Sequence, residues 1–266
     1  MQTLYKNKNM KKHLLDLKVL SAERLHERYV LLRLTHDQPL PAMQPGQFVE
    51  VRVDGSPHTF LRRPISINFV DRQRNELWLL VATVGDGTRR LALLQPGDTV
   101  SCLLPLGHGF SPAAAGQRLL LVGGGVGVAP LLWQGAQLSQ GGAEVTFLLG
   151  ARTAHDLLLL DEFRRYGRVE LTTEDGSQGQ QGFVTNHAIL QEEHFDLVQC
   201  CGPTPMMKAV AAYARQKGLS CEVSLENMMA CGLGACLCCV EKTTEGNLCV
   251  CKDGPVFNIN RLLWQS

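Results

Sequence analysis

Six of the ten cysteines in this 266-residue chain gather close to its C-terminal end. Cys231, Cys236 and Cys239 are spaced as C-x4-C-x2-C, and Cys249 and Cys251 follow a short distance later. This spacing is the plant-type arrangement of a [2Fe–2S] cluster, in which four thiolates bind two irons. The thiols therefore predict a one-electron centre near the end of the chain.

The spacing leaves the fourth ligand of this centre open. Cys249 and Cys251 would face the same side of a strand, so periodicity does not choose between them. Cys238 lies inside the two-residue gap and is surplus. Gly232 and Gly234 would let the loop wrap closely enough for backbone N–H groups to point at the sulfurs.

Zinc is the alternative metal, because four cysteines also form structural zinc sites. Such sites usually pair two C-x2-C knuckles, whereas here the first step is four residues and the far side offers only "CVC". The sequence thus favours iron and sulfide, and a zinc-stapled binding module is the alternative from another class. Colour would separate the two, since a zinc protein without flavin is colourless.

A glycine-rich turn predicts a dinucleotide site in the middle of the chain. The stretch "LLLVGGGVGVAPLL" reads as a buried strand, a turn and a helix, and "CGPTPMM" is a second turn that follows a strand. Glycines let the backbone approach a pyrophosphate, and the start of the helix favours its negative charge. Both turns would lie on one edge of a parallel sheet, where ligands bind. The expected nucleotide contacts are Gly123, Gly124, Gly125, Gly127, Pro130, Cys201, Gly202 and Pro203.

A nicotinamide dinucleotide and a one-electron cluster in one chain require a converter between them. The dinucleotide moves electrons in pairs as a hydride, and a flavin is the usual group that is stable when half-reduced. The stretch "FLRRPISI" predicts where the flavin binds. Arg63 would contact its pyrophosphate, Pro64 would stiffen the turn, and Ser66 would reach the flavin ring.

The surrounding sequence predicts three units that position these sites. Residues 1–112 contain short β-branched segments and Pro-Gly turns, as in an antiparallel β-barrel that would bind the flavin. Residues 113–219 alternate strand-like and helix-like stretches, which is typical of an α/β nucleotide domain with a parallel sheet. Residues 220–266 would form a small [2Fe–2S] domain. The expected fold class is therefore multi-domain.

Composition fits a folded globular protein without nucleic-acid or membrane partners. Apolar residues make up 45% and charged residues 19%, and the net charge of +1 gives no basic surface. The most apolar run, 119–133, is too short and too glycine-rich to cross a membrane. No signal-peptide stretch follows the lysines of the first dozen residues. We expect a cytoplasmic protein whose cysteines bind metal rather than form disulfides.

The order "RRPIS", "GGGVGVAP" and "CGPTPM" resembles that of the ferredoxin–NADP reductase superfamily. The tail, "ENMMACGLGACLCCV" followed by "CVCKDGPVF", more narrowly resembles the electron-transfer subunits of dihydroorotate dehydrogenase B, an NAD-linked bacterial enzyme of pyrimidine synthesis. This resemblance covers about residues 13–264. It implies that electrons pass from an FMN-containing catalytic subunit through [2Fe–2S] and FAD to NAD⁺, in a heterotetramer of two plus two subunits.

The resemblance also implies particular residues. The family's fourth cluster cysteine directly precedes a stretch like "KDGPVF", which selects Cys251. Ala82 stands where relatives often carry a basic residue. The FAD contacts map onto Arg63, Pro64, Ile65, Ser66, Leu80, Val81, Ala82, Gly87 and Thr88.

No catalytic residue for substrate chemistry is expected in this chain. The sequence shows no Ser-His-Asp arrangement or paired carboxylates, which leaves substrate oxidation to a partner subunit. The closest alternative is the flavin and iron–sulfur subunit of a ferredoxin:NADP⁺ oxidoreductase or sulfide dehydrogenase complex. Arg152 is the one candidate for a contact to a 2′-phosphate, and it does not decide between NAD and NADP.

Overall fold

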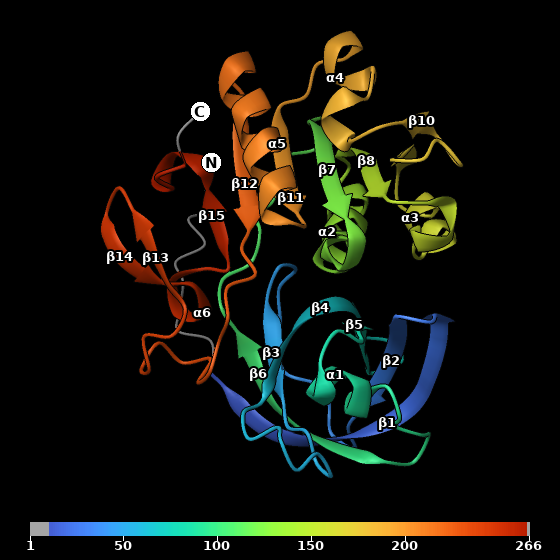
Figure 1. Cartoon of the computed structure of the whole chain (residues 1–266), viewed down its shortest axis with the longest axis vertical. Helices are drawn as coiled ribbons and strands as arrows, with labels where there is room; N and C mark the ends of the chain where they lie inside the picture. The colour runs from blue at the N-terminus through green and yellow to red at the C-terminus, as the bar shows by residue number, and fades with distance from the viewer. Residues whose placement is uncertain (1–10, 265–266) are drawn as a thin grey trace.

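The first six strands close into an antiparallel barrel in the order β1-β2-β5-β4-β3-β6 (Figure 1). The structure, a computed structural model, describes residues 11–264, so the first ten residues of the expected barrel domain and the last two of the chain lie outside it. Alternation decides which side chains fill the barrel: Leu17 and Val19 are buried, whereas Lys18 is exposed. The strands are β1 (His13–His26), β2 (Tyr29–Thr35), β3 (Phe48–Val51), β4 (Arg63–Asp71), β5 (Glu76–Ala82) and β6 (Thr99–Leu106).

A seven-stranded sheet follows, in the order β10-β9-β8-β7-β11-β12-β15. Neighbouring strands are parallel except for β12 and β15, which run antiparallel. Residues 119–122 of β7 are all buried, as expected for a strand covered on both faces. The strands are β7 (Arg118–Gly124), β8 (Glu144–Ala151), β9 (Arg168–Thr173), β10 (Gln180–Gln181), β11 (Leu197–Cys201), β12 (Ser220–Ser224) and β15 (Val256–Asn258).

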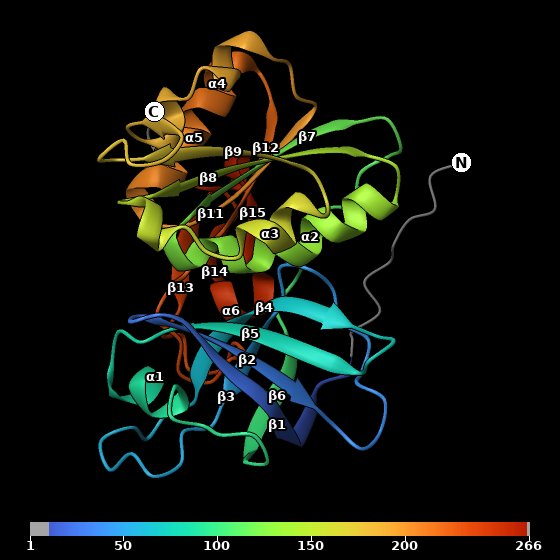
Figure 2. The same ribbon diagram turned by 90° about the vertical axis from the view of Figure 1, so that its right-hand side faces the viewer.

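Helices cover both faces of this sheet. Figure 2 shows α2 and α3 between the sheet and the barrel, and α5 on the opposite face. Asn68 of β4 donates from Nδ2 to the carbonyl oxygen of Ala129 at 2.9 Å, which joins the barrel to the start of α2. The helices are α1 (Asp86–Leu91), α2 (Ala129–Gln140), α3 (Leu160–Arg164), α4 (Ile189–Glu192), α5 (Thr204–Lys217) and α6 (Val250–Asp253). Shorter 3₁₀ turns are η1 (Gly125–Val128), η2 (Ala154–Asp156), η3 (Val184–Asn186) and η4 (Ile259–Arg261).

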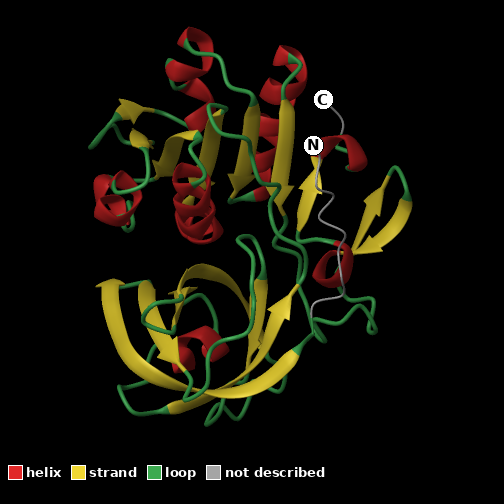
Figure 3. Cartoon of the chain, turned by 180° about the vertical axis from the view of Figure 1, so that it is seen from behind, coloured by secondary structure: helices red, strands yellow, loops and turns green. Residues whose placement is uncertain are grey.

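The C-terminal unit is built onto the edge of the sheet. Strands β13 (Val240–Thr243) and β14 (Gly246–Cys249) form a hairpin, α6 follows directly, and β15 returns to pair with β12. Figure 3 shows the hairpin and α6 beside the junction of barrel and sheet. The sheet thus continues through β12, beyond residue 219. Within residues 11–264, no helix has the length and apolar character needed to cross a membrane.

These elements confirm the predicted fold class. An antiparallel barrel precedes a parallel-sheet domain, and a small cysteine-containing unit ends the chain. The alternation of apolar residues and the Pro-Gly turns predicted the barrel, and the strand–turn–helix order predicted the sheet.

Candidate redox site

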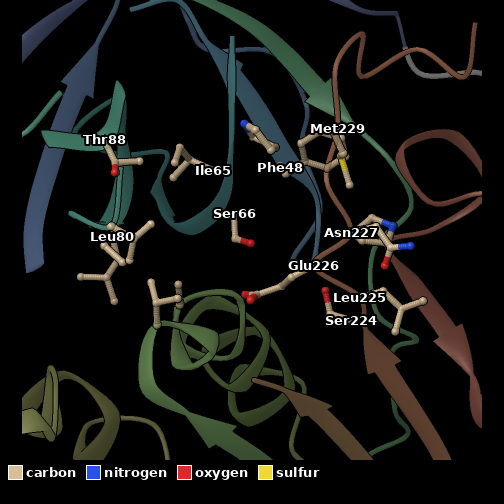
Figure 4. A pocket seen from close by; sticks show the side chains of 16 residues that line it. Phe48, Ile65, Ser66, Leu80, Thr88, Ser224, Leu225, Glu226, Asn227 and Met229 are labelled. Carbon is tan, nitrogen blue, oxygen red and sulfur yellow. The ribbon is translucent and has the colours of Figure 1, made fainter. Parts of the chain in front are cut away.

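A cavity of about 220 Å³ lies where the barrel, the glycine-rich turn and the segment after β12 meet (Figure 4). The side chain of Val81, a residue expected to contact the flavin, points away from this cavity and fills the barrel core. This follows from strand alternation, because Leu80 and Ala82 face outward on either side of it. Six of the expected flavin residues line the cavity: Pro64, Ile65, Ser66, Leu80, Ala82 and Thr88.

The two arginines of the "RRP" stretch have different surroundings. Arg62 is held by the barrel, donating to the carbonyl oxygen of Ser101 at 2.7 Å and to its hydroxyl at 3.1 Å. Arg63 donates from Nε to the carbonyl oxygen of Arg62 at 2.9 Å, while its two terminal nitrogens have no partner among residues 11–264. Of these two arginines, Arg63 is thus the one whose terminal N–H groups are available to bind a phosphate.

Gly87 leaves room for the Arg63 side chain. A Cβ atom at this position would stand 3.1 Å from Cδ of Arg63 and 3.0 Å from Cγ2 of Thr59. Thr88 follows at the start of α1, where the backbone N–H of Gly85 donates to its hydroxyl at 3.1 Å. The aliphatic part of Arg63 and the start of α1 therefore lie side by side, and Thr88 of α1 lines the cavity.

Glu226 is a residue of this site that the sequence reasoning missed. It follows β12 by two positions, and Figure 4 shows its carboxyl and the Ser66 hydroxyl both pointing into the cavity. Partial desolvation raises the pKa of Glu226, although its side chain stays exposed at the cavity and the Cys201 thiol, which donates toward it at 3.9 Å, lowers the pKa. A raised pKa favours a carboxyl that holds a proton. Its place after a strand that ends beside the nucleotide turn was the available signal.

Cys201 lies behind Glu226 rather than at the cavity wall. It ends β11 and is fully buried. Burial raises the pKa of its thiol, and the neighbouring charge of Glu226 raises it further. The thiol is therefore neutral and faces the Glu226 carboxyl as a donor.

The two glycine turns meet at the carboxyl edge of the sheet. Gly125 has a positive φ of 56° and begins η1, and α2 follows with Pro130 in its first turn. A Cβ on Gly127 would overlap the backbone of Gly202, and a Cβ on Gly124 would stand 3.3 Å from Cδ of Pro203. Close contact between the turns thus requires glycine at position 127, and a side chain on Gly124 would also meet Sδ of Met206 at 2.6 Å. Gly123, the last but one residue of β7, also lies close to this turn and helix, because a Cβ there would stand 2.9 Å from Cγ1 of Val128 and 3.1 Å from Cδ1 of Leu131.

The four expected cluster cysteines come together as two pairs of thiols. Against the raising effect of burial, Cys236 lowers the pKa of the neighbouring Cys231 thiol, and the backbone N–H of Cys251 donates to the Cys239 sulfur at 3.3 Å. Among residues 11–264 no three metal-ligating side chains surround a single point. Two pairs fit two irons, each of which takes two thiolates in a [2Fe–2S] cluster.

Backbone N–H groups point at these sulfurs. The amide of Leu233 donates to Cys231 at 3.3 Å, and the amide of Gly234 donates to Cys251 at 3.1 Å. Burial alone would raise the pKa of Cys231, but the backbone donors and the Cys236 thiol lower it to about 6. Cys231 is therefore readily present as a thiolate, the form that binds iron. The residues present fit the group that the spacing predicts.

The two surplus cysteines are placed differently. Cys249 ends β14, and its thiol faces the carbonyl oxygen of Gly234 at 3.8 Å, whereas the Cys251 sulfur accepts a hydrogen bond from the amide of Gly234. Cys238 is exposed, 3.6 Å from the carbonyl oxygen of Met228. The contacts thus distinguish Cys251 from Cys249, which spacing did not.

The barrel carries a cavity lined by residues expected to bind flavin, and a dinucleotide turn lies beside it. Together with the four-thiol centre, these features define an iron–sulfur flavoprotein reductase. A family model described as the iron-sulfur cluster binding domain of dihydroorotate dehydrogenase B matches residues 226–263, and one for an oxidoreductase NAD-binding domain matches residues 121–212.

Full-length relatives narrow this class to one family. The chain is 42% identical over 226 residues to the "Dihydroorotate dehydrogenase B (NAD(+)), electron transfer subunit" of Shouchella clausii, covering 83% of this chain and 86% of the relative. It is 40% identical over 249 residues to the Bacillus caldolyticus protein of the same name, covering 92% and 95%. The chain belongs to the family of dihydroorotate dehydrogenase B electron transfer subunits, which confirms the predicted resemblance.

Solved structures agree with this fold. One superposes with a TM-score of 0.85 at 30% identity, covering 93% of this chain and 90% of its own, and comes from work on electron bifurcation by an NADH-dependent reduced ferredoxin-NADP oxidoreductase. Phthalate dioxygenase reductase superposes with a TM-score of 0.61 at 24% identity, covering 76% and 64%, and shares the fold alone.

Proposed function

We propose that this chain receives electrons from a dihydroorotate-oxidising partner subunit and delivers them to NAD⁺. The observation that carries the proposal is the placement of a paired four-thiol centre, a flavin-lining cavity and a dinucleotide turn within one chain. The partner would contain FMN, and two copies of each subunit would form the complex. The barrel, residues 1–112, would bind FAD, residues 113–219 would bind NAD, and residues 220–266 would bind the cluster.

The chain's own residues would divide the work of holding these groups. When bound, the cluster supplies one-electron transfer and the flavin exchanges single electrons for a hydride. Cluster binding is assigned to Cys231, Cys236, Cys239 and Cys251. FAD binding is assigned to Arg63, Pro64, Ile65, Ser66, Leu80, Ala82, Gly87 and Thr88, and to Val81 through its backbone alone, because its side chain fills the barrel core. NAD binding is assigned to Gly123, Gly124, Gly125, Gly127, Pro130, Cys201, Gly202 and Pro203.

Three polar groups would orient the ring system and control its proton. The terminal nitrogens of Arg63 would bind the pyrophosphate, and the Ser66 hydroxyl would donate to the ring from the cavity wall. Glu226 would hold a proton on its carboxyl opposite Ser66, supported by its raised pKa. The apolar side chains of Leu80 and Val126 would exclude water from the space between.

The partner subunit would dock over the cysteine loop. Met228 is 84% exposed, Leu237 is 65% exposed, and Leu233 is 43% exposed, so apolar side chains surround the thiols at the surface. Apolar groups gathered on a surface mark protein contacts, and electron transfer requires the partner to approach this loop. Cys236 is exposed in the same loop.

The test is to isolate the tagged protein anaerobically from its own host and to add dihydroorotate and NAD⁺. Growth of NADH absorbance, with an FMN-bearing subunit in the eluate, supports the proposal. Cys251→Ser should abolish this activity, and Cys249→Ser, two residues away, is the matched control that should retain it. NADPH turnover with ferredoxin and a different partner would instead favour the second candidate, a ferredoxin:NADP⁺ oxidoreductase subunit, which the 30% identity to the reduced ferredoxin-NADP oxidoreductase structure supports.

A further inference from the structure

The barrel places one side chain against the glycine-rich turn of the sheet domain. Tyr29 is the first residue of β2, and its hydroxyl oxygen is the one heavy atom within 4 Å of the position that a Cβ on Gly125 would take, at 3.9 Å. Gly125 opens the turn with its positive φ. The phenol therefore looks onto the open side of the turn, where a dinucleotide phosphate would approach the backbone.

The Tyr29 ring is fixed, but its hydroxyl has no partner. The residue is only 8% exposed, its ring packs in the apolar cluster with Leu31 and Trp78, and its centroid lies 5.8 Å from that of His26. No hydrogen bond to the hydroxyl occurs in the described chain, residues 11–264. The hydroxyl oxygen is not among the fully buried unpartnered atoms of these residues, so it opens to solvent beside the turn, where a ligand can accept from it.

Two arginines and one aspartate act electrostatically on the same hydroxyl. Burial raises the pKa of Tyr29, while Arg28 lowers it most, Asp156 raises it and Arg152 lowers it, so all three charges lie within electrostatic reach. Asp156 faces His26 at 3.8 Å. The guanidinium groups of Arg28 and Arg152 form no ion pair or hydrogen bond with any described residue. Two free cations and one free donor at a glycine turn suit a diphosphate.

We propose that Tyr29 is a further nucleotide-binding residue, whose O–H donates to a phosphate oxygen of the nicotinamide dinucleotide on the glycine-rich turn. Arg28 and Arg152 balance the charge of that phosphate. The inference rests on the proposed function, because it takes this turn as the NAD site. Tyr29 pairs with Ala82 in the barrel, and Ala82 lines the flavin cavity. One strand pair thus connects the nucleotide phosphate to the flavin wall.

The test compares Tyr29→Phe with the natural chain in the cofactor-loaded complex. This change keeps the ring and removes only the O–H. The apparent Kd for NADH, taken from the concentration dependence of flavin reduction in stopped flow, should rise about tenfold, since a hydrogen bond to a charged group is lost. The limiting rate at saturating NADH and the visible spectrum should stay unchanged, which a merely packing role would not produce.

Two further measurements keep the result decisive. Tyr213→Phe is the matched control, because its hydroxyl donates to the carbonyl oxygen of Leu190 at 3.0 Å, and its Kd should equal that of the natural chain. Arg152→Gln should weaken NADH binding severalfold as well. Equal NADH affinity in Tyr29→Phe and the natural chain overturns the inference. Failure of the natural complex to bind NADH at all would instead reject the proposed function.

Discussion

Replacing Glu50 with glutamine should stabilise the protein in alkaline solution and change it little in acid. Glu50 lies on β3, is 1% exposed, and is the one acidic residue among the buried polar side chains of residues 11–264. Both of its carboxylate oxygens lack a hydrogen-bond partner there. Its methylene packs against the cysteine loop, where a Cβ on Gly232 would stand 2.8 Å from Cγ of Glu50.

The size of the effect follows from the pKa of this carboxyl. Burial raises the pKa from 4.5 to about 7, while the nearby charges of Arg63 and Arg62 lower it. A raised folded-state pKa means that stability is fully present below pH 4.5 and is lost as the pH rises through 7. This rise in pKa lowers the free energy of unfolding by about 3 kcal/mol at pH 9 and by about 1 kcal/mol at pH 5. Glu50→Gln removes this penalty, since glutamine does not ionise.

The assay is urea unfolding of both proteins at pH 5 and pH 9, followed by tryptophan fluorescence. The midpoint of Glu50→Gln should exceed that of the natural chain clearly at pH 9 and only slightly at pH 5. Glu23, an exposed glutamate on β1, provides the control, because Glu23→Gln should follow the natural pH dependence. Parallel curves for Glu50→Gln and the natural chain would mean that the carboxylate ionises without cost, and would refute the reasoning.

Three further substitutions test the cofactor and partner sites. Arg63→Gln should lower the FAD content of the purified protein severalfold, because the donors to the pyrophosphate are lost. The visible absorbance of the flavin measures this content. Gly127→Ala should weaken NADH binding at least tenfold in stopped-flow flavin reduction, because its methyl group overlaps the backbone of Gly202, and unchanged binding would show that the turns can separate. Leu237→Glu should leave the visible spectrum intact but release the partner subunit in size-exclusion chromatography; a co-eluting partner would place the docking surface elsewhere.

The sequence predicted the chemistry of the cysteines better than their local conformation. The C-x4-C-x2-C spacing is a local property of the sequence that does not depend on how the domains pack, so it identified the cluster site. On an assumed continuous strand, periodicity left Cys249 and Cys251 undecided, and only the resemblance to the family selected Cys251. In the structure β14 ends at Cys249 and α6 begins at Val250, so the chain turns between the two thiols and they no longer share a face.

Glu226 and Tyr29 show what spacing cannot supply. Each is a single residue without a repeated pattern around it, and each reaches its site only because strands distant in sequence lie side by side. Tyr29 meets Gly125 through the packing of the barrel on the sheet domain. Periodicity reports which residues are buried within one element, whereas contacts between domains depend on the complete fold.

The flavin cavity and the cysteine centre are joined by the chain itself. The segment that leaves β12 lines the cavity as far as Met229, and Cys231 follows two residues later. Two extended residues span at most about 7 Å, so the first cluster ligand lies next to the cavity wall. Asn227, two residues before Met229, donates from Nδ2 to Glu241 at 3.0 Å, which anchors the segment to β13. Because one anchored segment sets this separation, the position of a docked partner can vary without changing the path between the two sites.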